Sequence, residues 1–250
     1  MRKVSVWDVK FLDPCLKPSE DVRRALVIVN QSFSFSLLNR LWSCTQWHCC
    51  ADGGANRLFD LLGELQANGG YLPDLIKGDL DSLRDDVRKY YVAKGVCLVR
   101  DHDQDSTDLM KCVSSLQELE RREGCEYELL LLGGLSGRLD QTIHTLSYLH
   151  KLRKQRKKVF VVTDDSVGWV LDSGEHTIKI DHGLVGKTCG LLPVGVDCTV
   201  LSTSGLEWDL TDRASSFDGM ISTSNHLIPG RDVWIKTTKP IWWTVEMRPQ

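Results

Sequence analysis

The sequence predicts an α/β fold, with a parallel-sheet α/β domain over residues 1–165 followed by an antiparallel β-sandwich domain over residues 166–250. Two observations predict it. In the first part, short apolar runs alternate with segments whose apolar residues recur at helical spacing, which is typical of parallel strands joined by helices. In the second part, short strand-like segments are separated by turn residues, and no long helical period occurs.

The α/β pattern begins at the apolar run 24–30, which is typical of a strand buried on both faces. Residues 1–22 are expected to be a peripheral lead-in. Further strands are expected at 49–51, 75–76, 96–99, 127–132 and 159–162, with helices at 37–42, 55–65, 87–94, 108–119 and 140–154. Glycine- and aspartate-rich segments follow several of these strands. Ligand groups gather at the carboxyl ends of parallel strands, so these segments are the candidate site.

The second half is expected to be built from short strands at 169–171, 176–180, 198–201, 220–223, 233–235 and 242–245. The segment 183–188 ends in Gly-Lys-Thr like a phosphate-binding P-loop, but Asp181 stands where the first glycine of that motif belongs. We therefore expect this segment to be a connection between strands.

Composition favours a soluble globular protein, since 42% of the 250 residues are hydrophobic and 26% are charged. The net charge of −3 argues against a surface that binds nucleic acid, and no apolar run is long enough to cross a membrane. The nine cysteines show no metal-ligand spacing. We expect a cytoplasmic protein without a membrane or nucleic-acid partner, and interpret the basic run 151–158 as a solvated helix end.

Two aspartates separated by one residue, Asp79 and Asp81, follow the short strand at 75–76. If the backbone is extended there, both side chains point to the same face. Carboxylate oxygens suit Mg²⁺, which usually keeps positions open for water and phosphate oxygens. A solvated turn is the alternative interpretation, because Gly, Asp and Ser are common turn residues.

Three further motifs follow other expected strands. Residues 105–108, Asp-Ser-Thr-Asp, predict a helix start at which Asp108 keeps an oxygen free for a metal. Residues 51–57 contain paired glycines that expose backbone N–H groups, although a tight strand-to-helix turn also needs glycine. Residues 133–141 combine glycines, Arg138 and a helix start, which favours phosphate binding.

The ordered series of these motifs closely resembles the thiamin pyrophosphokinase family, in its animal type. The matching motifs are A-D-G-G-A-N-R (51–57), P-D-x-I-x-G-D-x-D-S (73–82), D-Q-D-x-T-D (103–108) and G-G-L-x-G-R-x-D-Q (133–141), followed by similar segments at 190–195, 203–208 and 222–225. Leu80 and Leu139 stand where a common family form has Phe, and Ser106 stands where it has His. The last difference argues against a role for the side chain at 106.

The resemblance implies an enzyme that transfers the pyrophosphoryl group of ATP to the hydroxyl of thiamine. It also implies a homodimer, with thiamine bound where the α/β domain of one subunit meets the β domain of the other. Expected catalytic residues are Asp52, Asp79, Asp81 and Asp108, of which the last three are the expected Mg²⁺ ligands. Expected ATP- or phosphate-binding residues are Gly53, Gly54, Asn56, Arg57, Gly134, Arg138 and Asp140. Expected thiamine-binding residues are Gln104, Thr107, Trp208, Ser222, Ser224 and Asn225.

This chemistry agrees with the residues themselves, because phosphoryl-type transfer depends on positioning and charge neutralisation. Either Asp81 or Asp52 is a candidate acceptor for the hydroxyl proton, and the sequence does not choose between them. Trp208 is a candidate for stacking on the cationic thiazolium, although a tryptophan in a β domain is usually part of the core. Two alternatives stay open: a Mg²⁺-dependent phosphohydrolase, and a non-catalytic protein that binds thiamine or a nucleotide.

Overall fold

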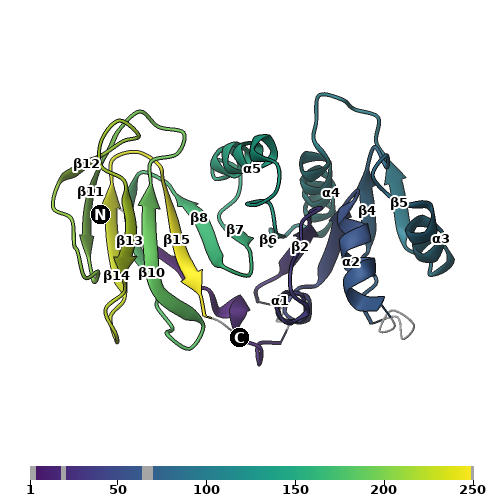
Figure 1. Cartoon of the computed structure of the whole chain (residues 1–250), viewed down its shortest axis with the longest axis horizontal. Coiled ribbons are helices and arrows are strands. Elements are labelled where there is room, and N and C mark those ends of the chain that lie inside the picture. The colour runs from purple at the N-terminus through teal and green to yellow at the C-terminus, as the bar shows by residue number, and fades with distance from the viewer. Residues whose placement is uncertain (1–3, 18–20, 64–69, 249–250) are drawn as a thin grey trace. The chain divides into compact units, whose positions relative to one another are not determined.

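The computed structural model of the chain describes residues 4–17, 21–63 and 70–248 (Figure 1). The chain forms two compact units. The α/β unit is drawn from Pro14–Thr145 and Phe160–Thr163, and the β-rich unit from Met1–Asp13, Leu146–Val159 and Asp164–Gln250. The predicted classes of both parts agree with this structure, but the limits differ from the expected division at 165, because two earlier segments belong to the β-rich unit.

The expectation that residues 1–22 are a peripheral lead-in was wrong for residues 5–12, while its residues 1–3 and 18–20 lie outside the described part of the chain. β1 (Ser5–Trp7) pairs in parallel with β9 (Gly174–Ile178), and a short 3-10 helix, η1 (Lys10–Leu12), follows it. Trp7, Phe11 and Leu12 are buried in the core. A strand of three residues shows no readable alternation, so its pairing with a strand far along the chain was not visible in the sequence.

The sheet of the α/β unit has the strand order β7-β6-β2-β3-β4-β5, with parallel pairing of β2 with β6, β2 with β3, β3 with β4, and β4 with β5. Its strands are β2 (Arg24–Ile28), β3 (Trp47–Ala51), β4 (Leu75–Gly78), β5 (Cys97–Arg100), β6 (Glu128–Leu132) and β7 (Val159–Val162). Its helices are α1 (Phe35–Ser43), α2 (Gly54–Leu62), α3 (Asp85–Ala93), α4 (Asp108–Glu123) and the first half of α5 (Leu139–Leu152).

The central strand β2 is buried at every residue, which requires both faces of the sheet to be covered. Figure 1 shows helices flanking these strands. The chain passes from β2 through β3 and β4 to β5, and then returns to place β6 on the other side of β2. The strand order therefore reverses between β2 and β6. In open α/β sheets, the crevice at the carboxyl ends of two such strands is the usual ligand site.

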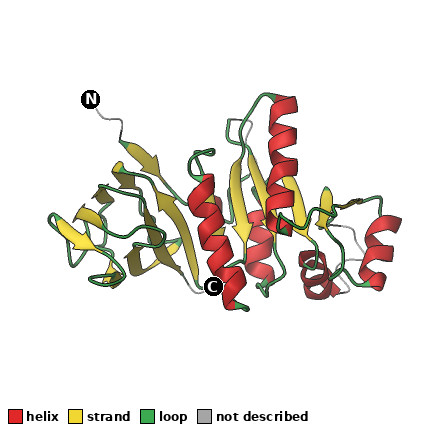
Figure 2. Ribbon diagram, turned by 90° about the horizontal axis from the view of Figure 1, so that it is seen from above, coloured by secondary structure: helices red, strands yellow, loops and turns green. Residues whose placement is uncertain are grey.

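The β-rich unit contains two sheets, β1-β9-β14-β11-β12 and β13-β10-β15-β8. Its remaining strands are β8 (Ser166–Leu171), β10 (Val185–Leu192), β11 (Thr199–Ser204), β12 (Arg213–Ser215), β13 (Ser222–His226), β14 (Val233–Thr237) and β15 (Ile241–Met247). Neighbouring strands in these sheets pair antiparallel, except for β1 with β9, which pair in parallel. Figure 2 shows these strands joined by loops. Gly183 and Leu184 lie in the turn before β10, as expected of a strand connection, but Gly186-Lys187-Thr188 lies within β10, so the expectation for 183–188 was wrong in its second half.

Large aromatic side chains fill the interior between the two sheets of the β-rich unit. The ring of Trp7 from β1 stacks on that of Trp169 from β8, with centroids 5.7 Å apart. Trp243 from β15 lies 6.4 Å from Trp169 in turn. Trp169 and Trp243 are fully buried. These contacts tie the N-terminal strand to the second half of the chain, which explains why residues 4–13 belong to this unit.

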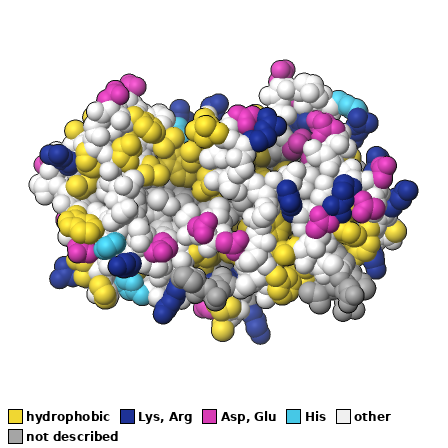
Figure 3. All heavy atoms as spheres, viewed as in Figure 1, with side chains coloured by type: hydrophobic (Ala, Val, Ile, Leu, Met, Phe, Trp, Pro, Cys, Tyr) yellow, Lys and Arg dark blue, Asp and Glu magenta, His cyan; other side chains and the backbone are white. Residues whose placement is uncertain are grey.

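In the part of the chain that the structure describes, there is no helix with both the length and the apolar character needed to span a bilayer. Acidic and basic side chains are interspersed on the face shown in Figure 3, as the small net charge of −3 would suggest.

Candidate active site

A pocket of about 620 Å³ lies at the carboxyl ends of the strands of the α/β unit. It is lined by residues that follow β2, β3 and β4, by the start of α4, and by the glycine-rich loop after β6. The pocket thus includes the reversal point between β2 and β6. The predicted location of the site, at the ends of the parallel strands, agrees with this position.

Three carboxylates converge in this pocket. Asp52 follows β3, Asp79 follows β4, and Asp108 is the first residue of α4. One oxygen from each lies within 4.8 Å of the others. Three acidic side chains at such distances repel one another, so a cation between them would relieve this repulsion. We call these three residues the acid cluster.

Asp52 is held rigidly and is almost fully buried, with 3% of its surface exposed. Its backbone N–H donates to the Lys77 carbonyl at 3.0 Å, and its Oδ2 accepts a hydrogen bond from the Ser82 N–H at 3.0 Å. Its other carboxylate oxygen, Oδ1, is buried and has no hydrogen-bond partner among the described residues. A buried carboxylate oxygen without a donor is costly, and a metal ion would satisfy it.

Asp108 is oriented by the start of α4, where the Thr107 hydroxyl caps the helix by accepting from the Met110 N–H at 3.5 Å. Its Oδ1 accepts from the backbone N–H of Asp79 at 3.3 Å, which links two members of the acid cluster. The buried ammonium of Lys111 lies 3.3 Å from the same oxygen and donates to the Asp101 carbonyl at 3.0 Å. Lys111 therefore offsets part of the negative charge.

Burial controls the protonation of the acid cluster. The pKa of Asp52 is raised to about 6, chiefly by burial and further by the charges of Asp108 and Asp79, while the hydrogen bond from Ser82 opposes the shift. The pKa of Asp108 is also raised, chiefly by burial, with Lys111 acting in the opposite direction. Without a bound cation, the cluster holds its negative charge only at a cost.

Asp81 lines the same pocket but does not belong to the acid cluster, and its side chain is exposed. The backbone is not extended here, because Leu80 between Asp79 and Asp81 has a φ of 62°, so the alternative interpretation of a turn is correct. The carboxylate of Asp79 instead accepts the Asp81 N–H at 3.1 Å, which makes a tight turn. The acid cluster thus contains Asp52 together with two of the three expected Mg²⁺ ligands, Asp79 and Asp108.

Gly78 lets the cluster form. A Cβ at this position would lie 2.7 Å from the Cβ of Asp52 and 2.9 Å from the Oδ1 of Asp108. Real Cβ atoms do not approach other atoms so closely, so any side chain here would push the two aspartates apart. The glycine before Asp79 is thus required by the packing of the acids around it.

Gln31, just after β2, organises the glycine-rich loop after β6. Its side-chain oxygen accepts hydrogen bonds from the Gly134 N–H at 2.7 Å, the Ser136 N–H at 3.1 Å and the Ser136 hydroxyl at 2.9 Å. These donors are satisfied by the Gln31 oxygen, so the three hydrogen bonds fix the shape of the loop beside the acid cluster. Gly133, Gly134 and Gly137 all have positive φ, which explains the glycines of this loop.

The other predicted phosphate-binding residues have different surroundings. The Asn56 amide donates to the Ser82 carbonyl at 2.7 Å and accepts from the Arg84 N–H at 3.1 Å, so it braces the turn after β4. Arg57 donates to the side-chain oxygen of Asn30 at 2.9 Å. Arg138 lines the pocket and forms an exposed ion pair with Asp140 at 2.6 Å. Gly53 lines the pocket, and Gly54 begins α2 against the backbone of Ile28.

Comparison with known proteins agrees with this geometry. The family model described as the thiamin pyrophosphokinase catalytic domain matches residues 38–161, and the model of the thiamin pyrophosphokinase vitamin B1 binding domain matches residues 175–242. The chain belongs to the thiamin pyrophosphokinase family.

Relatives of this family match over almost the whole chain. The chain is 36% identical to thiamine pyrophosphokinase 1 of Arabidopsis thaliana, over 98% of this chain and 94% of the relative. It is 30% identical to thiamine pyrophosphokinase of Saccharomyces cerevisiae, over 98% of this chain and 92% of the relative. The crystal structure of yeast thiamin pyrophosphokinase superposes with a TM-score of 0.87 at 30% identity, over 99% of this chain and 92% of that one.

The thiamine-binding residues predicted from the thiamin pyrophosphokinase resemblance lie in both units. Gln104 and Thr107 line the pocket of the α/β unit. In the β-rich unit, Asn225 is buried and its amide bonds to the backbone of Trp208, at 3.2 Å from the Trp208 N–H and 2.9 Å to its carbonyl. Trp208 is 54% exposed, so it is not a core residue.

The two predicted serines of this unit lie on β13. Ser222 pairs with Leu191 of β10, and Ser224 has a φ of 54°. Ser224 lines a second, smaller pocket of about 280 Å³ together with Thr223 and Glu246.

The residues that line the pocket but were not singled out from the sequence include Asn30, Gln31 and Lys111. Asn30 and Gln31 directly follow the apolar run of β2, which is the position where a polar side chain reaches the sheet edge. Their position after the strand could therefore have been used to predict them as pocket residues. Lys111 follows Asp108 at a spacing of three along α4, a common surface ion-pair spacing, and its burial was not readable.

Proposed function

We propose that the chain transfers the pyrophosphoryl group of ATP to the hydroxyl of thiamine, giving thiamine diphosphate and AMP. Membership of the thiamin pyrophosphokinase family supports this function. The observation that carries it in the structure is the acid cluster beside the loop held by Gln31, in one pocket at the reversal point of the sheet. Carboxylates that can hold a metal ion, together with the guanidinium of Arg138 in the same pocket, fit a metal–nucleotide complex.

Asp52, Asp79 and Asp108 are the proposed Mg²⁺ ligands, in place of the set with Asp81. Their hard oxygen donors suit Mg²⁺, and within the described ranges the buried Oδ1 of Asp52 has no hydrogen-bond partner. The bound ion would neutralise charge on the β- and γ-phosphates of ATP. Lys111 keeps Asp108 oriented and limits the charge of the cluster when the ion is absent.

The remaining groups of the pocket have proposed roles that follow from their donors. Arg138 would hold phosphate oxygens, since its guanidinium offers hydrogen bonds to anions, and the glycine-rich loop held by Gln31 would shape the pocket beside it. Asp81 lines the pocket outside the cluster, so its carboxylate remains available to accept the proton of the thiamine hydroxyl. This assignment chooses between the two acceptors that the sequence left open.

The proposal also assigns the thiamine-binding residues, which are Gln104, Thr107, Trp208, Ser222, Ser224 and Asn225. Asp140 is proposed as the partner of Arg138. The protein is further proposed to be a cytoplasmic homodimer whose sites are shared between subunits. The exposed ring of Trp208 supports it, because a solvent-facing indole can stack on a flat cation.

The test is an assay with purified protein, ATP and thiamine, with and without Mg²⁺, that follows AMP and thiamine diphosphate together. We expect equal amounts of both products, and only with thiamine and Mg²⁺ present. Phosphate release from ATP that does not depend on thiamine would instead identify a phosphohydrolase. Binding of both substrates without any turnover would identify a non-catalytic binding protein.

A further inference from the structure

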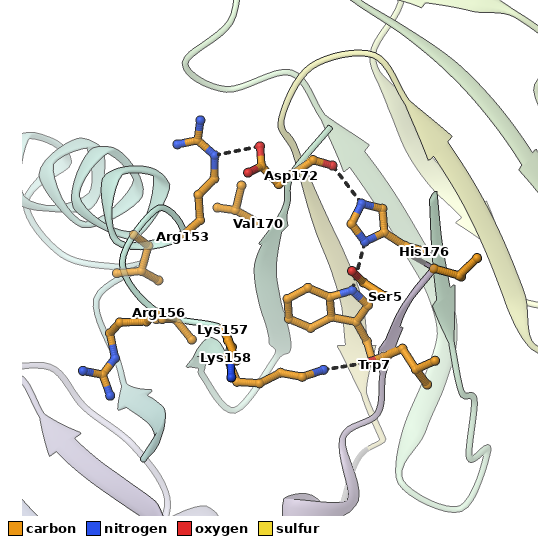
Figure 4. Close-up of a pocket in the computed structure, with 13 residues that line it drawn as sticks. Ser5, Trp7, Arg153, Arg156, Lys157, Lys158, Val170, Asp172 and His176 are labelled. Atoms are coloured by element: carbon orange, nitrogen blue, oxygen red, sulfur yellow. Dashed lines mark hydrogen bonds and ion pairs between the residues drawn. The ribbon is translucent and has the colours of Figure 1, made fainter. Parts of the chain in front are cut away.

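A second large cavity, of about 540 Å³, lies entirely within the β-rich unit. Its walls come from β1, from the end of α5 with the turn that follows it, and from β8 and β9 (Figure 4). None of the residues proposed for catalysis or substrate binding lines it. Its volume lies in the range of pockets that hold small organic ligands, about 300–1,000 Å³.

The cavity is strongly cationic. Arg153, Arg156, Lys157 and Lys158 line it, and Asp172 is the one carboxylate among its lining residues. Asp172 is already paired with Arg153 at 3.4 Å, so it offsets only part of this charge. The chain as a whole is negative, with a net charge of −3, so this concentration of positive charge is a local feature. It favours an anionic ligand.

His176 does not add to the charge. Its Nδ1 accepts a hydrogen bond from the Trp7 indole N–H at 3.1 Å, and its Nε2 lies 2.8 Å from the carbonyl of Asp172. Burial lowers the pKa of His176, so the ring stays neutral and donates its one N–H to that carbonyl. The polar wall is thereby fixed in one arrangement, which gives the cavity a defined shape.

Two of the cations are held in place by the fold. The Lys158 ammonium lies 3.9 Å from the centroid of the Trp7 ring and donates to the carbonyl of Val6. The Arg153 guanidinium bonds to the carbonyl of His150 and to Asp172. In Figure 4, Arg153 and Lys158 reach the cavity from opposite sides, with Val170 and Trp7 between them. Preorganised donors of this kind bind anions at a low entropic cost.

The rest of the wall is apolar. Leu149, Val159, Val170 and the edge of Trp7 are buried side chains that face the same cavity. A solvated helix end, as the basic run 151–158 was interpreted, accounts for exposed Lys151 and Lys154 but not for cations beside an apolar cavity. A ligand with both an anionic group and an apolar ring would use both parts of the wall.

We propose that this cavity is a second ligand site, which binds a small heteroaromatic organic phosphate. Nucleotides and thiamine phosphates share this chemistry, and both are reactants or products of the proposed reaction. The site would bind its ligand without Mg²⁺ and without turnover, because it contains no part of the acid cluster. Arg153 and Lys157 would hold the phosphate, and the apolar wall would hold the ring.

The test is hydrogen–deuterium exchange of the full chain without Mg²⁺, with AMP, thiamine diphosphate or inorganic pyrophosphate added. Comparing AMP with thiamine diphosphate shows whether the site prefers a nucleotide or a thiamine phosphate. We expect one of them to protect the backbone of residues 4–7 and 149–159, and pyrophosphate to protect it at least about 10-fold less effectively. Equal protection by pyrophosphate would overturn the aromatic part of the proposal. Protection by none of the three would overturn the site.

Two double variants separate a built site from general charge attraction. Arg153→Gln with Lys157→Gln removes two cations from the cavity wall, whereas Lys151→Gln with Lys154→Gln removes two exposed cations from the same run outside it. We expect the first pair to weaken the protection about 10-fold or more and the second to leave it within about twofold, since hydrogen bonds to charged groups are individually strong. Equal weakening by both pairs would overturn the site.

Fold and function are checked separately. A melting temperature within a few degrees of the wild type shows that the first double variant folds, and Lys157→Gln alone, at an exposed residue, tests the cavity without disturbing the Asp172 ion pair. A protein without turnover that still shows the protection would refute the proposed reaction and keep this site. Normal turnover without protection would support the proposed reaction and refute this second site.

Discussion

The side-chain oxygen of Gln31 accepts a hydrogen bond from the backbone N–H of Gly134 at 2.7 Å, across 103 residues of sequence. This bond joins the carboxyl end of β2 to the loop after β6, on the two sides of the reversal point in the sheet. Gln31 also binds Ser136 through that residue's N–H and hydroxyl. The shape of the proposed phosphate-binding loop therefore depends on one amide side chain from another strand.

Replacing Gln31 tests this dependence. Gln31→Met keeps the length of the side chain but removes both the acceptor and the amide donor. We expect the KM for ATP to rise about 10-fold, because four hydrogen bonds to the loop are lost. The KM for thiamine should change little. Steady-state kinetics with each substrate varied in turn provide the measurement. Gln31→Glu restores an acceptor but adds a charge that repels phosphate, so an ATP KM unchanged in both variants would refute the role.

Gly78→Ala should damage the site through packing alone. Its Cβ would meet Asp52 and Asp108 at less than 3 Å, so the acid cluster must open. We expect a loss of about 1–3 kcal/mol in the free energy of unfolding, as for other overpacked sites, and a fall in kcat of about 100-fold or more. Urea unfolding and the AMP assay measure these effects.

Gly70→Ala is the matched control, because an added Cβ there meets nothing within 4 Å. It should leave both quantities unchanged. Full activity in Gly78→Ala would mean that the three carboxylates need not lie as close as they do here.

The sequence was sufficient to predict the α/β architecture and the end of the sheet that carries the site. Alternating apolar runs and helical segments imply parallel strands, and the carboxyl ends of such strands meet on one edge. Acids that follow separate strands, such as Asp52 and Asp79, were therefore expected together. That inference needs only topology, because every residue just after a strand arrives at the same edge.

Details that depend on single dihedral angles or on contacts between distant segments could not be predicted from the sequence. A φ of 62° at Leu80 turns Asp81 out of the acid cluster, and no local rule predicts that angle for a leucine. The burial of Lys111 and the hydrogen bond from the Ser136 hydroxyl to Gln31 arise from packing between segments far apart in the chain. The three-residue strand β1 was missed for the same reason, since its partner is β9.

The acid cluster predicts a specific response to Mg²⁺. Asp52→Asn, Asp79→Asn and Asp108→Asn should each lower kcat by about 100-fold or more. Without Mg²⁺, Asp52→Asn should melt at a higher temperature than the wild type, because it removes repulsion from Asp79 and Asp108. Mg²⁺ at 100 times its Kd should stabilise the wild type by about 2.7 kcal/mol, and these variants much less.

Asp81→Asn is the informative comparison. It should lose turnover if Asp81 accepts the proton of thiamine, yet keep the stabilisation by Mg²⁺, because it lies outside the cluster. Melting curves with and without Mg²⁺, followed by differential scanning calorimetry, separate the two roles. Loss of the Mg²⁺ response in Asp81→Asn would return this residue to the proposed ligand set.

A shared site predicts rescue between two inactive variants. Asp79→Asn removes a proposed metal ligand from the α/β unit, and Trp208→Ala removes a proposed thiamine contact from the β-rich unit. In a symmetric dimer whose sites combine both units from different subunits, half of the dimers after random mixing carry one intact site of two, giving about a quarter of wild-type activity. Mixing after mild denaturation, with size-exclusion chromatography to confirm dimers, measures it. No recovery in proven mixed dimers would place each site within one subunit.

His176 predicts a loss of stability at acid pH. Burial is the main cause of its lowered pKa, the Lys158 charge acts in the same direction, and contacts with Asp172 oppose the shift. Because the folded-state pKa lies below the unfolded value of 6.5, the unfolded chain binds a proton more readily. The contribution of the neutral ring is therefore complete above pH 6.5 and is lost as the pH falls through the folded-state pKa.

Urea unfolding at pH 7.5 and pH 5.5 would measure this effect as the difference in unfolding free energy between the two conditions. His176→Gln should be less stable than the wild type at the higher pH, because it disturbs the hydrogen bonds to Trp7 and Asp172, and it should lose less stability on acidification. His102→Gln removes an exposed histidine and should keep the wild-type pH dependence. If His176→Gln and His102→Gln lose the same stability between the two conditions, the buried ring is not the group that titrates.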